Sequence, residues 1–177
     1  MQSVKIDRFL RLGIGVLAVV LVSVIYAAIH ERVVVKGDTA PDFSITSDSG
    51  RTVSLPNFEG KLLILNFWAS WCGPCVEETP SLSEFAQEYA GKGVVVLGVS
   101  VDKDPQAYQR FLQKYKPGFL TARDSKIHED YGTFMYPETY IIDSKGKVVL
   151  KIPETPDSPA ALDWTDPKVK QFIDSLL

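Results

Sequence analysis

The chain has 177 residues, 45% of them hydrophobic and 23% charged, which is typical of one folded domain with a short additional segment. The net charge is only −3, and no Lys/Arg cluster occurs in the folded part, so we expect no nucleic-acid partner. Two cysteines are too few for a disulfide-rich scaffold or a four-cysteine zinc site, and we predict neither a metal nor a cofactor.

The N-terminal segment predicts a membrane anchor. The apolar run Leu12–Ile29 carries no charged residue, and as a helix it would be about 27 Å long, enough for a bilayer core. Basic residues precede it, which favours an N-terminus in the cytoplasm. A cleaved signal peptide is the alternative, but the run is longer than a usual signal core and Tyr26–His30 is a poor cleavage site. We therefore predict residues 1–30 as cytoplasmic tail and transmembrane anchor, 31–37 as linker and 38–177 as the extracytoplasmic domain.

The domain is expected to contain a β-hairpin, then β-α-β-α-β, then β-β-α. Alternating segments around the turn cluster Ser47–Gly50 predict the N-terminal hairpin. Further strands are expected at 62–68, 94–101, 119–121, 139–142 and 147–152, and helices at 72–89, 104–115, 125–131 and 165–177. Pro80 should kink or restart the first of these helices. The alternation through the middle indicates a mixed sheet with right-handed crossovers and helices on both faces.

The two cysteines lie in the motif Trp71-Cys72-Gly73-Pro74-Cys75, between a buried strand and a helix. Unpaired N–H groups and the dipole at a helix N-terminus stabilise a thiolate. We expect Cys72 to be the exposed attacking thiol and Cys75 to be the more buried thiol that resolves the mixed disulfide. A static disulfide is the alternative, but so short a loop would add little stability. A Cys-x-x-Cys beside a β-α-β pattern predicts a redox site.

These residues resemble a known family. The stretch from Asn66 to Cys75, followed by Glu78-Thr79-Pro80, is similar to the membrane-anchored thioredoxin-like oxidoreductases of the TlpA/ResA group. Further stretches agree with it: Ala40-Pro41-Asp42-Phe43 with Gly60-Lys61, Tyr136-Pro137-Glu138-Thr139, and Asp143-Ser144-Lys145-Gly146. The resemblance covers about residues 38–177 and includes the anchor. It implies an α/β thioredoxin-like fold, a central mixed sheet flanked by helices, with an N-terminal β-hairpin extension.

Glu78 is the third predicted catalytic residue. It follows Cys75 by three positions, so it lies on the same side of the helix, whereas Glu77 should face solvent. A carboxylate there could accept the proton of the buried thiol. The TlpA/ResA group carries an activity-related Glu at this position, whereas thioredoxin has a buried Asp in the preceding strand, where this chain has Asn66. The alternative is a solvated carboxylate that stabilises the helix through its dipole.

The resemblance also implies a client-binding side. Pro137 is expected to follow a cis peptide bond in a loop that faces the cysteines, where Tyr136 offers backbone groups to an extended client. Trp71 borders the attacking thiol and could contact a partner, whereas Trp68 is expected in the core. The two histidines are expected at the surface without a catalytic part. Trp164 shows no functional pattern.

We therefore predict an extracytoplasmic thiol-disulfide oxidoreductase. The pair Gly73-Pro74 matches thioredoxin, so the resemblance implies that the protein reduces disulfides. The expected partners are disulfide-containing clients, with apocytochrome c as the leading candidate, and a membrane thiol electron donor. Three alternatives stay open: a disulfide donor of the same fold, a non-catalytic binding module, and a thiol peroxidase. Peroxiredoxins share the fold and a similar opening stretch, but Ser70-Trp71-Cys72 replaces their Thr-x-x-Cys setting.

Overall fold

The computed structural model describes residues 13–26, 33–153 and 161–177. The chain divides into two compact units, Met1–Val33 and Val34–Leu177. Each unit is described separately below.

Within the first unit, residues 13–26 form a helix. Both ends of the predicted anchor, Leu12–Ile29, lie outside the described residues. The basic residues that precede it lie outside them as well. Of the helices that the described ranges contain, none has the length and apolar character needed to cross a membrane.

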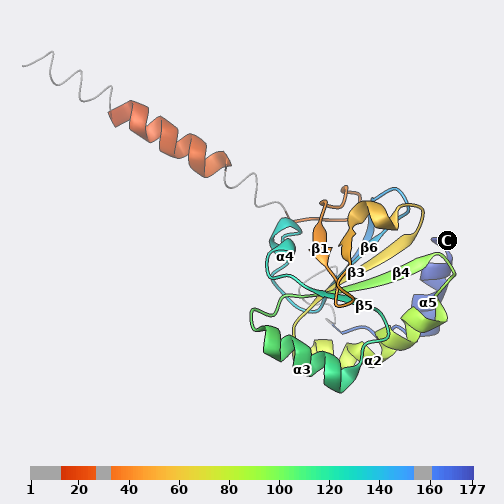
Figure 1. Ribbon diagram of the computed structural model, residues 1–177. Helices are drawn as coiled ribbons and strands as arrows, with labels where there is room; N and C mark the ends of the chain where they lie inside the picture. The colour runs from red at the N-terminus through yellow and green to blue at the C-terminus, as the bar shows by residue number, and fades with distance from the viewer. Residues whose placement is uncertain (1–12, 27–32, 154–160) are drawn as a thin grey trace, which may run out of the picture. The chain divides into compact units, whose positions relative to one another are not determined.

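The second unit is an α/β fold around a mixed sheet with the strand order β5-β4-β3-β6-β7 (Figure 1). Its strands are β1 (Ser44–Thr46), β2 (Thr52–Ser54), β3 (Leu62–Trp68), β4 (Val94–Ser100), β5 (Leu120–Arg123), β6 (Glu138–Ile142) and β7 (Val148–Ile152). Its helices are the 3-10 helix η1 (Leu55–Phe58) and the α-helices α2 (Gly73–Glu88), α3 (Pro105–Tyr115), α4 (Ile127–Asp130) and α5 (Pro167–Asp174). Strands β3, β4 and β5 run parallel, whereas β6 is antiparallel to both β3 and β7. The mixed character of the sheet and the order of strands and α-helices along the chain are those that the sequence pattern predicted, whereas η1 was not predicted.

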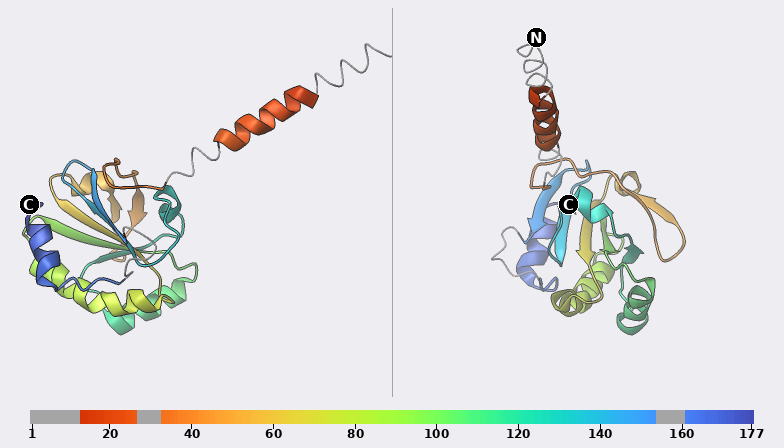
Figure 2. Two further views of the ribbon diagram at one scale, coloured as in Figure 1. Left: turned by 180° about the vertical axis from the view of Figure 1, so that it is seen from behind. Right: turned by 90° about the vertical axis from the view of Figure 1, so that its left-hand side faces the viewer.

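Strand β3 lies at the centre of the sheet, and every one of its residues is buried. Side chains alternate along a strand, so β3 contributes to an apolar cluster on each face. One cluster joins the sheet to α2 and α5. The other joins it to β1, η1 and α4 and, through Trp68, extends to Tyr108 and Phe111 of α3. Figure 2 shows α5 beside α2, with α4 and the β1–β2 hairpin across the sheet from them. The N-terminal end of α2 therefore lies next to the end of the central strand β3.

The β1–β2 hairpin is attached to the rest of the unit through its turn. The carboxylate of Asp48 accepts a hydrogen bond from the hydroxyl of Tyr108 in α3, at 2.6 Å, and one from the hydroxyl of Thr121 in β5. The preceding segment also packs with this unit. Val34, which falls in the predicted linker, is buried, and its N–H donates to the carbonyl of Tyr131 at 3.1 Å. The folded unit therefore begins before residue 38.

Helix α2 runs from Gly73 to Glu88 as one continuous α-helix with Pro80 inside it. Of the two predicted effects of Pro80, a kink or a restart of the helix, the restart does not occur. The hydroxyl groups of Thr79 and Ser83 donate to carbonyl groups one turn earlier, both at 2.7 Å, which gives this part of the helix hydrogen bonds beyond the backbone ladder. The residues before and after Pro80 therefore belong to one helix that packs against one face of the sheet.

Gly98 in β4 is required by close packing. A Cβ atom at this position would lie 2.7 Å from a ring carbon of Phe119 and 3.0 Å from Nε1 of Trp68. We expect Gly98→Ala to lower the free energy of unfolding by about 1–3 kcal/mol, the usual cost of overpacking a core. Urea denaturation followed by tryptophan fluorescence measures this loss. In a Phe119→Leu background the cost should be smaller, because the nearest ring atom is gone; equal costs in both backgrounds would contradict this explanation.

Candidate active site

The two cysteines are joined in a disulfide at the N-terminus of α2. The Cα atoms of Cys72 and Cys75 are 5.3 Å apart. Cys72 is the N-cap residue of the helix, and the backbone N–H of Cys75 donates to Sγ of Cys72 at 3.2 Å. This N–H is one of the donors that a helix leaves unpaired at its start. When the disulfide is reduced, the same donor and the helix dipole favour a thiolate at Cys72.

Both sulfur-bearing residues are nearly covered. Cys72 is 5% exposed and Cys75 is 3% exposed. Cys75 is the more buried of the two, as predicted, but the prediction that Cys72 is exposed is wrong. The reason is a loop that is distant in sequence: Sγ of Cys72 lies 3.4 Å from the carbonyl oxygen of Tyr136. This loop therefore limits access to the sulfur of Cys72.

The loop that covers Cys72 contains a cis peptide bond between Tyr136 and Pro137, as predicted. Around it the surface is apolar, because Trp71 and Phe134 are 68% and 74% exposed and Met135 is exposed as well. The rings of Trp71 and Tyr136 contact each other edge to face, with centroids 5.9 Å apart. We call the exposed side chains of Trp71, Phe134 and Met135 the apolar rim. Phe134 and Met135 were missed by the sequence analysis, since isolated exposed apolar residues carry no periodic signal.

His128 is half-buried, not fully at the surface as predicted. Its Nδ1 lies 3.0 Å from the carbonyl oxygen of Thr133 and 3.2 Å from the hydroxyl of Tyr136. Its ring therefore supports Tyr136 from the side of α4. His30 lies outside the described residues.

A buried carboxylate holds the loop that precedes Cys72. Asp102 accepts hydrogen bonds from the backbone N–H and the hydroxyl of Ser70, at 2.9 and 2.8 Å, and from the hydroxyl of Ser100 at 2.7 Å. Asp102 follows β4 and Ser70 follows β3. The carboxyl ends of neighbouring parallel strands lie at the same edge of a sheet. The positions of Ser70 and Asp102, directly after β3 and β4, could therefore have predicted their contact.

Glu78 is buried, with 4% of its surface exposed, whereas Glu77 is exposed as predicted. Its Oε1 accepts a hydrogen bond from Nε1 of Trp164 at 2.5 Å. Burial raises the pKa of Glu78 to about 7. Hydrogen bonds from Trp164, the backbone of Leu162 and Asn66 oppose part of this rise in pKa. The alternative of a solvated helix carboxylate is therefore wrong.

Asn66 lies in β3 on the face that carries α2. It is buried, and its Nδ2 donates to the hydroxyl of Thr139 in β6 at 2.9 Å. Side chains alternate along β6, so the adjacent Glu138 lies on the opposite face, where it pairs with Lys151 at 3.0 Å. Asn66 therefore brings a neutral amide to this side of the sheet, and Glu78 is a buried carboxylate near it on α2.

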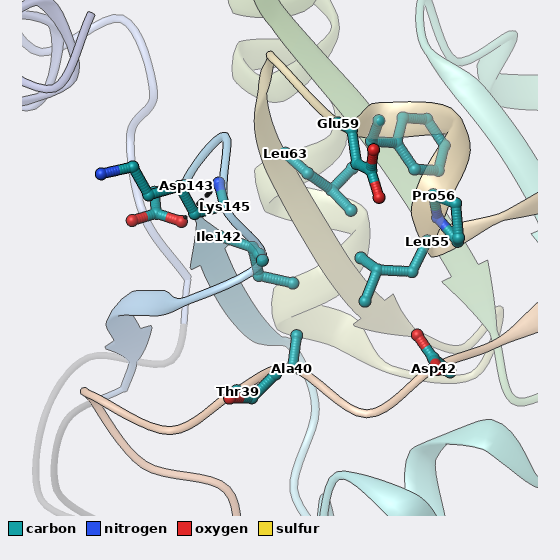
Figure 3. Close-up of a pocket in the computed structure, with 12 residues that line it drawn as sticks. Thr39, Ala40, Asp42, Leu55, Pro56, Glu59, Leu63, Ile142, Asp143 and Lys145 are labelled. Carbon is teal, nitrogen blue, oxygen red and sulfur yellow. Dashed lines mark hydrogen bonds between the residues drawn. The ribbon is translucent and has the colours of Figure 1, made fainter.

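A separate cavity of about 210 Å³ lies at the opposite end of β3 from the cysteines (Figure 3). It borders Leu63 near the start of the strand, and Figure 3 shows Asp42 and Glu59 on one side of it and Asp143 and Lys145 on the other. Across the three described ranges, no group of three or more His, Cys, Asp or Glu side chains is arranged to hold a metal ion.

Comparisons with known proteins agree with this geometry. Residues 36–151 match the AhpC/TSA family. The chain is 40% identical over 116 residues to the thioredoxin-like protein YneN of Bacillus subtilis (strain 168), covering 64% of this chain and 68% of that protein. It is 32% identical over 149 residues to the thiol-disulfide oxidoreductase ResA of Geobacillus thermodenitrificans (strain NG80-2), covering 83% of this chain and 81% of that one.

The fold has solved counterparts. A crystal structure from Chlorobium tepidum, of a protein assigned as the thiol:disulfide interchange protein DsbE, superposes with a TM-score of 0.70 at 31% identity. The match covers 80% of this chain and 96% of that one. The disulfide at the helix N-terminus, the cis-proline loop against it and these relatives agree with one another. The chain belongs to the AhpC/TSA family, has a thioredoxin-like fold, and is a thiol-disulfide oxidoreductase of the ResA type.

Proposed function

We propose that this protein reduces disulfide bonds of client proteins outside the cytoplasm, with an apocytochrome c as the leading client. The observation that carries the proposal is the place of Cys72, at the start of α2 and 3.4 Å from the carbonyl of Tyr136 in the cis-proline loop. An extended client that pairs with the backbone of this loop brings its own sulfur to Cys72. The apolar rim offers contact area to the residues that flank the client sulfur.

The reaction consists of two exchanges. In the reduced protein, the Cys72 thiolate attacks one sulfur of the client disulfide, which breaks that bond and releases the other client sulfur as a thiolate that takes a proton from water. Cys75 then loses its proton to Glu78, and its thiolate attacks Sγ of Cys72. This second step releases the first client sulfur and forms the Cys72–Cys75 disulfide. Two electrons pass from the protein to the client, and the protein ends in the disulfide state seen in the structure.

Three features support the reducing direction and the location. Gly73-Pro74 is the dipeptide of thioredoxin, which is a reductant. The apolar run Leu12–Ile29, preceded by basic residues, favours an anchor that places the domain outside the cytoplasm. The sequence holds no third cysteine, so the oxidised protein needs an external dithiol. We propose a membrane thiol protein in this role; it reduces Cys72–Cys75 by the same two exchanges in reverse.

The alternatives have less support. A peroxidase would be compatible with the AhpC/TSA match, but the relatives described above are named as thioredoxin-like or thiol-disulfide proteins. A purely structural binding module would not need two bonded cysteines against the cis-proline loop. A disulfide donor uses the same geometry, so only the redox potential separates it from a reductase.

The redox potential of the Cys72–Cys75 pair tests the proposal. We expect a value near that of thioredoxin, about −270 mV, and we expect the reduced protein to open the disulfide of an oxidised Cys-x-x-Cys-His peptide. Equilibration with thioredoxin or glutathione buffers, followed by alkylation and mass spectrometry, measures the potential. A value of about −120 mV, typical of strong oxidants, would show that the protein donates disulfides and does not reduce them. Consumption of peroxide by the reduced protein at a higher rate than the peptide reaction would favour the peroxidase.

A further inference from the structure

Trp164 joins the C-terminal segment to the active-site helix. Its side chain is fully buried, and its ring packs against Phe85 of α2 with centroids 5.4 Å apart. Its indole N–H points at Glu78 and donates to Oε1. Glu78 and Trp164 are 86 residues apart in the chain, so this contact exists only because the end of the chain folds back onto α2.

The segment around Trp164 is held to α2 by contacts of its own. The backbone N–H of Trp164 and the carbonyl of Leu162 each lie 3.3 Å from the hydroxyl of Ser81, which donates to the carbonyl and accepts from the N–H. Further along, the hydroxyl of Tyr89 donates to Asp174 of α5 at 2.8 Å. These contacts hold the chain to α2 both at Trp164 and in the helix α5 that follows it. Trp164 is therefore a rigid donor to Glu78.

The charged groups around Glu78 do not stabilise its ionised form. A shallow cavity of about 460 Å³ borders Glu78, and its titratable lining consists of carboxylates, Glu77 and Glu84 from α2 and Asp163 from the C-terminal segment. On the sheet side the neighbours are the neutral Asn66 and Thr139. On α2 itself the titratable neighbour towards the active site is Cys75. On α5, Lys170 pairs with Glu88 at 2.5 Å. Hydrogen-bond donors must therefore stabilise the carboxylate, and the indole N–H is one of them.

We propose that Trp164 is a positioning residue for the second exchange: its indole N–H holds the Glu78 side chain in place and favours the ionised form, which accepts the proton of Cys75. This inference rests on the proposed function and extends it to the C-terminal segment. The step it serves moves one proton, from the Cys75 thiol to the Glu78 carboxylate. The resulting thiolate closes the disulfide, and Glu78 returns the proton to water.

Trp164→Phe tests the proposal, because phenylalanine keeps an aromatic ring against Phe85 and removes only the N–H donor. The purified full chain is reduced and mixed with an oxidised Cys-x-x-Cys-His peptide, and peptide release is followed at a series of pH values. We expect the midpoint of the pH profile to rise by about one unit. Loss of the N–H donor removes a hydrogen bond that favours the charged carboxylate, and such a bond corresponds to about one unit of pKa. At neutral pH the release step should slow by up to about tenfold.

Two further variants separate positioning from packing. Phe85→Leu disturbs the same aromatic contact without removing a donor to Glu78, so it should lower stability and leave the midpoint unchanged. In a Glu78→Gln background, Trp164→Phe should add no shift, because the group it acts on is gone. An unchanged midpoint in Trp164→Phe, or the same shift with and without Glu78, would overturn the proposal and leave Trp164 as a packing residue.

Direct titration of Glu78 makes the result independent of the proposed function. Carbon-13 NMR of the carboxyl group, in the full chain and in its Trp164→Phe variant, reads the effect of the donor without any client. If the wild type fails to reduce the peptide, the proposed function fails, yet the upward shift of the Glu78 titration is still expected. If the titrations of wild type and variant coincide, the inference about Trp164 fails whatever the client reaction shows.

Discussion

Cys72→Ala is expected to reduce client-disulfide reduction to background, whereas Cys75→Ser should retain the first exchange and stop there. The structure gives the two sulfurs different positions. Sγ of Cys72 accepts the helix N-terminal N–H of Cys75 and lies beside the carbonyl of Tyr136, where an extended client would bind. Cys75 lies one turn further into α2 and is the less exposed of the pair. The client should therefore bond to Cys72 and to no other residue.

Mass spectrometry under non-reducing conditions distinguishes the two variants. With the oxidised Cys-x-x-Cys-His peptide, Cys75→Ser should accumulate a covalent adduct whose fragments place the peptide on Cys72, and Cys72→Ala should give none. Far-UV circular dichroism provides the control that both variants fold. An adduct on Cys75 in Cys72→Ala, formed as fast as the Cys72 adduct in the other variant, would exchange the roles of the two residues.

The free energy of unfolding should fall by about 3 kcal/mol as the pH rises from about 4.5 to above 7, and Glu78→Gln should remove this fall. Burial raises the pKa of Glu78 from 4.5 to about 7 in the folded protein. Between these values the folded state holds a proton that the unfolded state has lost, so raising the pH favours unfolding. The stabilising contribution is complete below the unfolded pKa and is lost as the pH passes the folded pKa.

Urea denaturation at pH values from 4 to 8.5 measures this dependence, with the difference between wild type and Glu78→Gln as the quantity of interest. Glu77→Gln is the matched control: it changes the neighbouring carboxylate, which is exposed, and should keep the wild-type slope. Asp48, whose pKa burial also raises, contributes equally to all three proteins. A Glu78→Gln slope that equals that of the wild type would show that Glu78 does not hold a proton in the folded state at neutral pH.

Local patterns sufficed for the fold and for part of the site. The continuous apolar runs of β3 and β4 predicted buried parallel strands, and the Cys-x-x-Cys after β3 placed two sulfurs at a helix start. The stretch Tyr136–Thr139 predicted the cis-proline loop through a family resemblance. Glu78 could be singled out because three residues along a helix return to the same side.

Contacts between distant segments explain what the sequence did not reveal. Trp164 meets Glu78 only after the last helix folds onto α2, and no periodicity in residues 161–166 indicates this. Likewise, the covering of Cys72 depends on Tyr136, which lies 64 residues away. The course of α2 through Pro80 depends on tertiary packing, which outweighs the local preference against proline.

The low exposure of Cys72 beside the Tyr136 carbonyl restricts which disulfides can approach its sulfur. A disulfide inside a folded domain is surrounded by its own neighbours and cannot be pushed past the Tyr136 carbonyl to the sulfur. A chain that has not yet folded can extend, enter edge-on and present one sulfur at a time. Under the proposed function, the coverage of Cys72 therefore favours disulfides in extended chains over disulfides enclosed in folded domains.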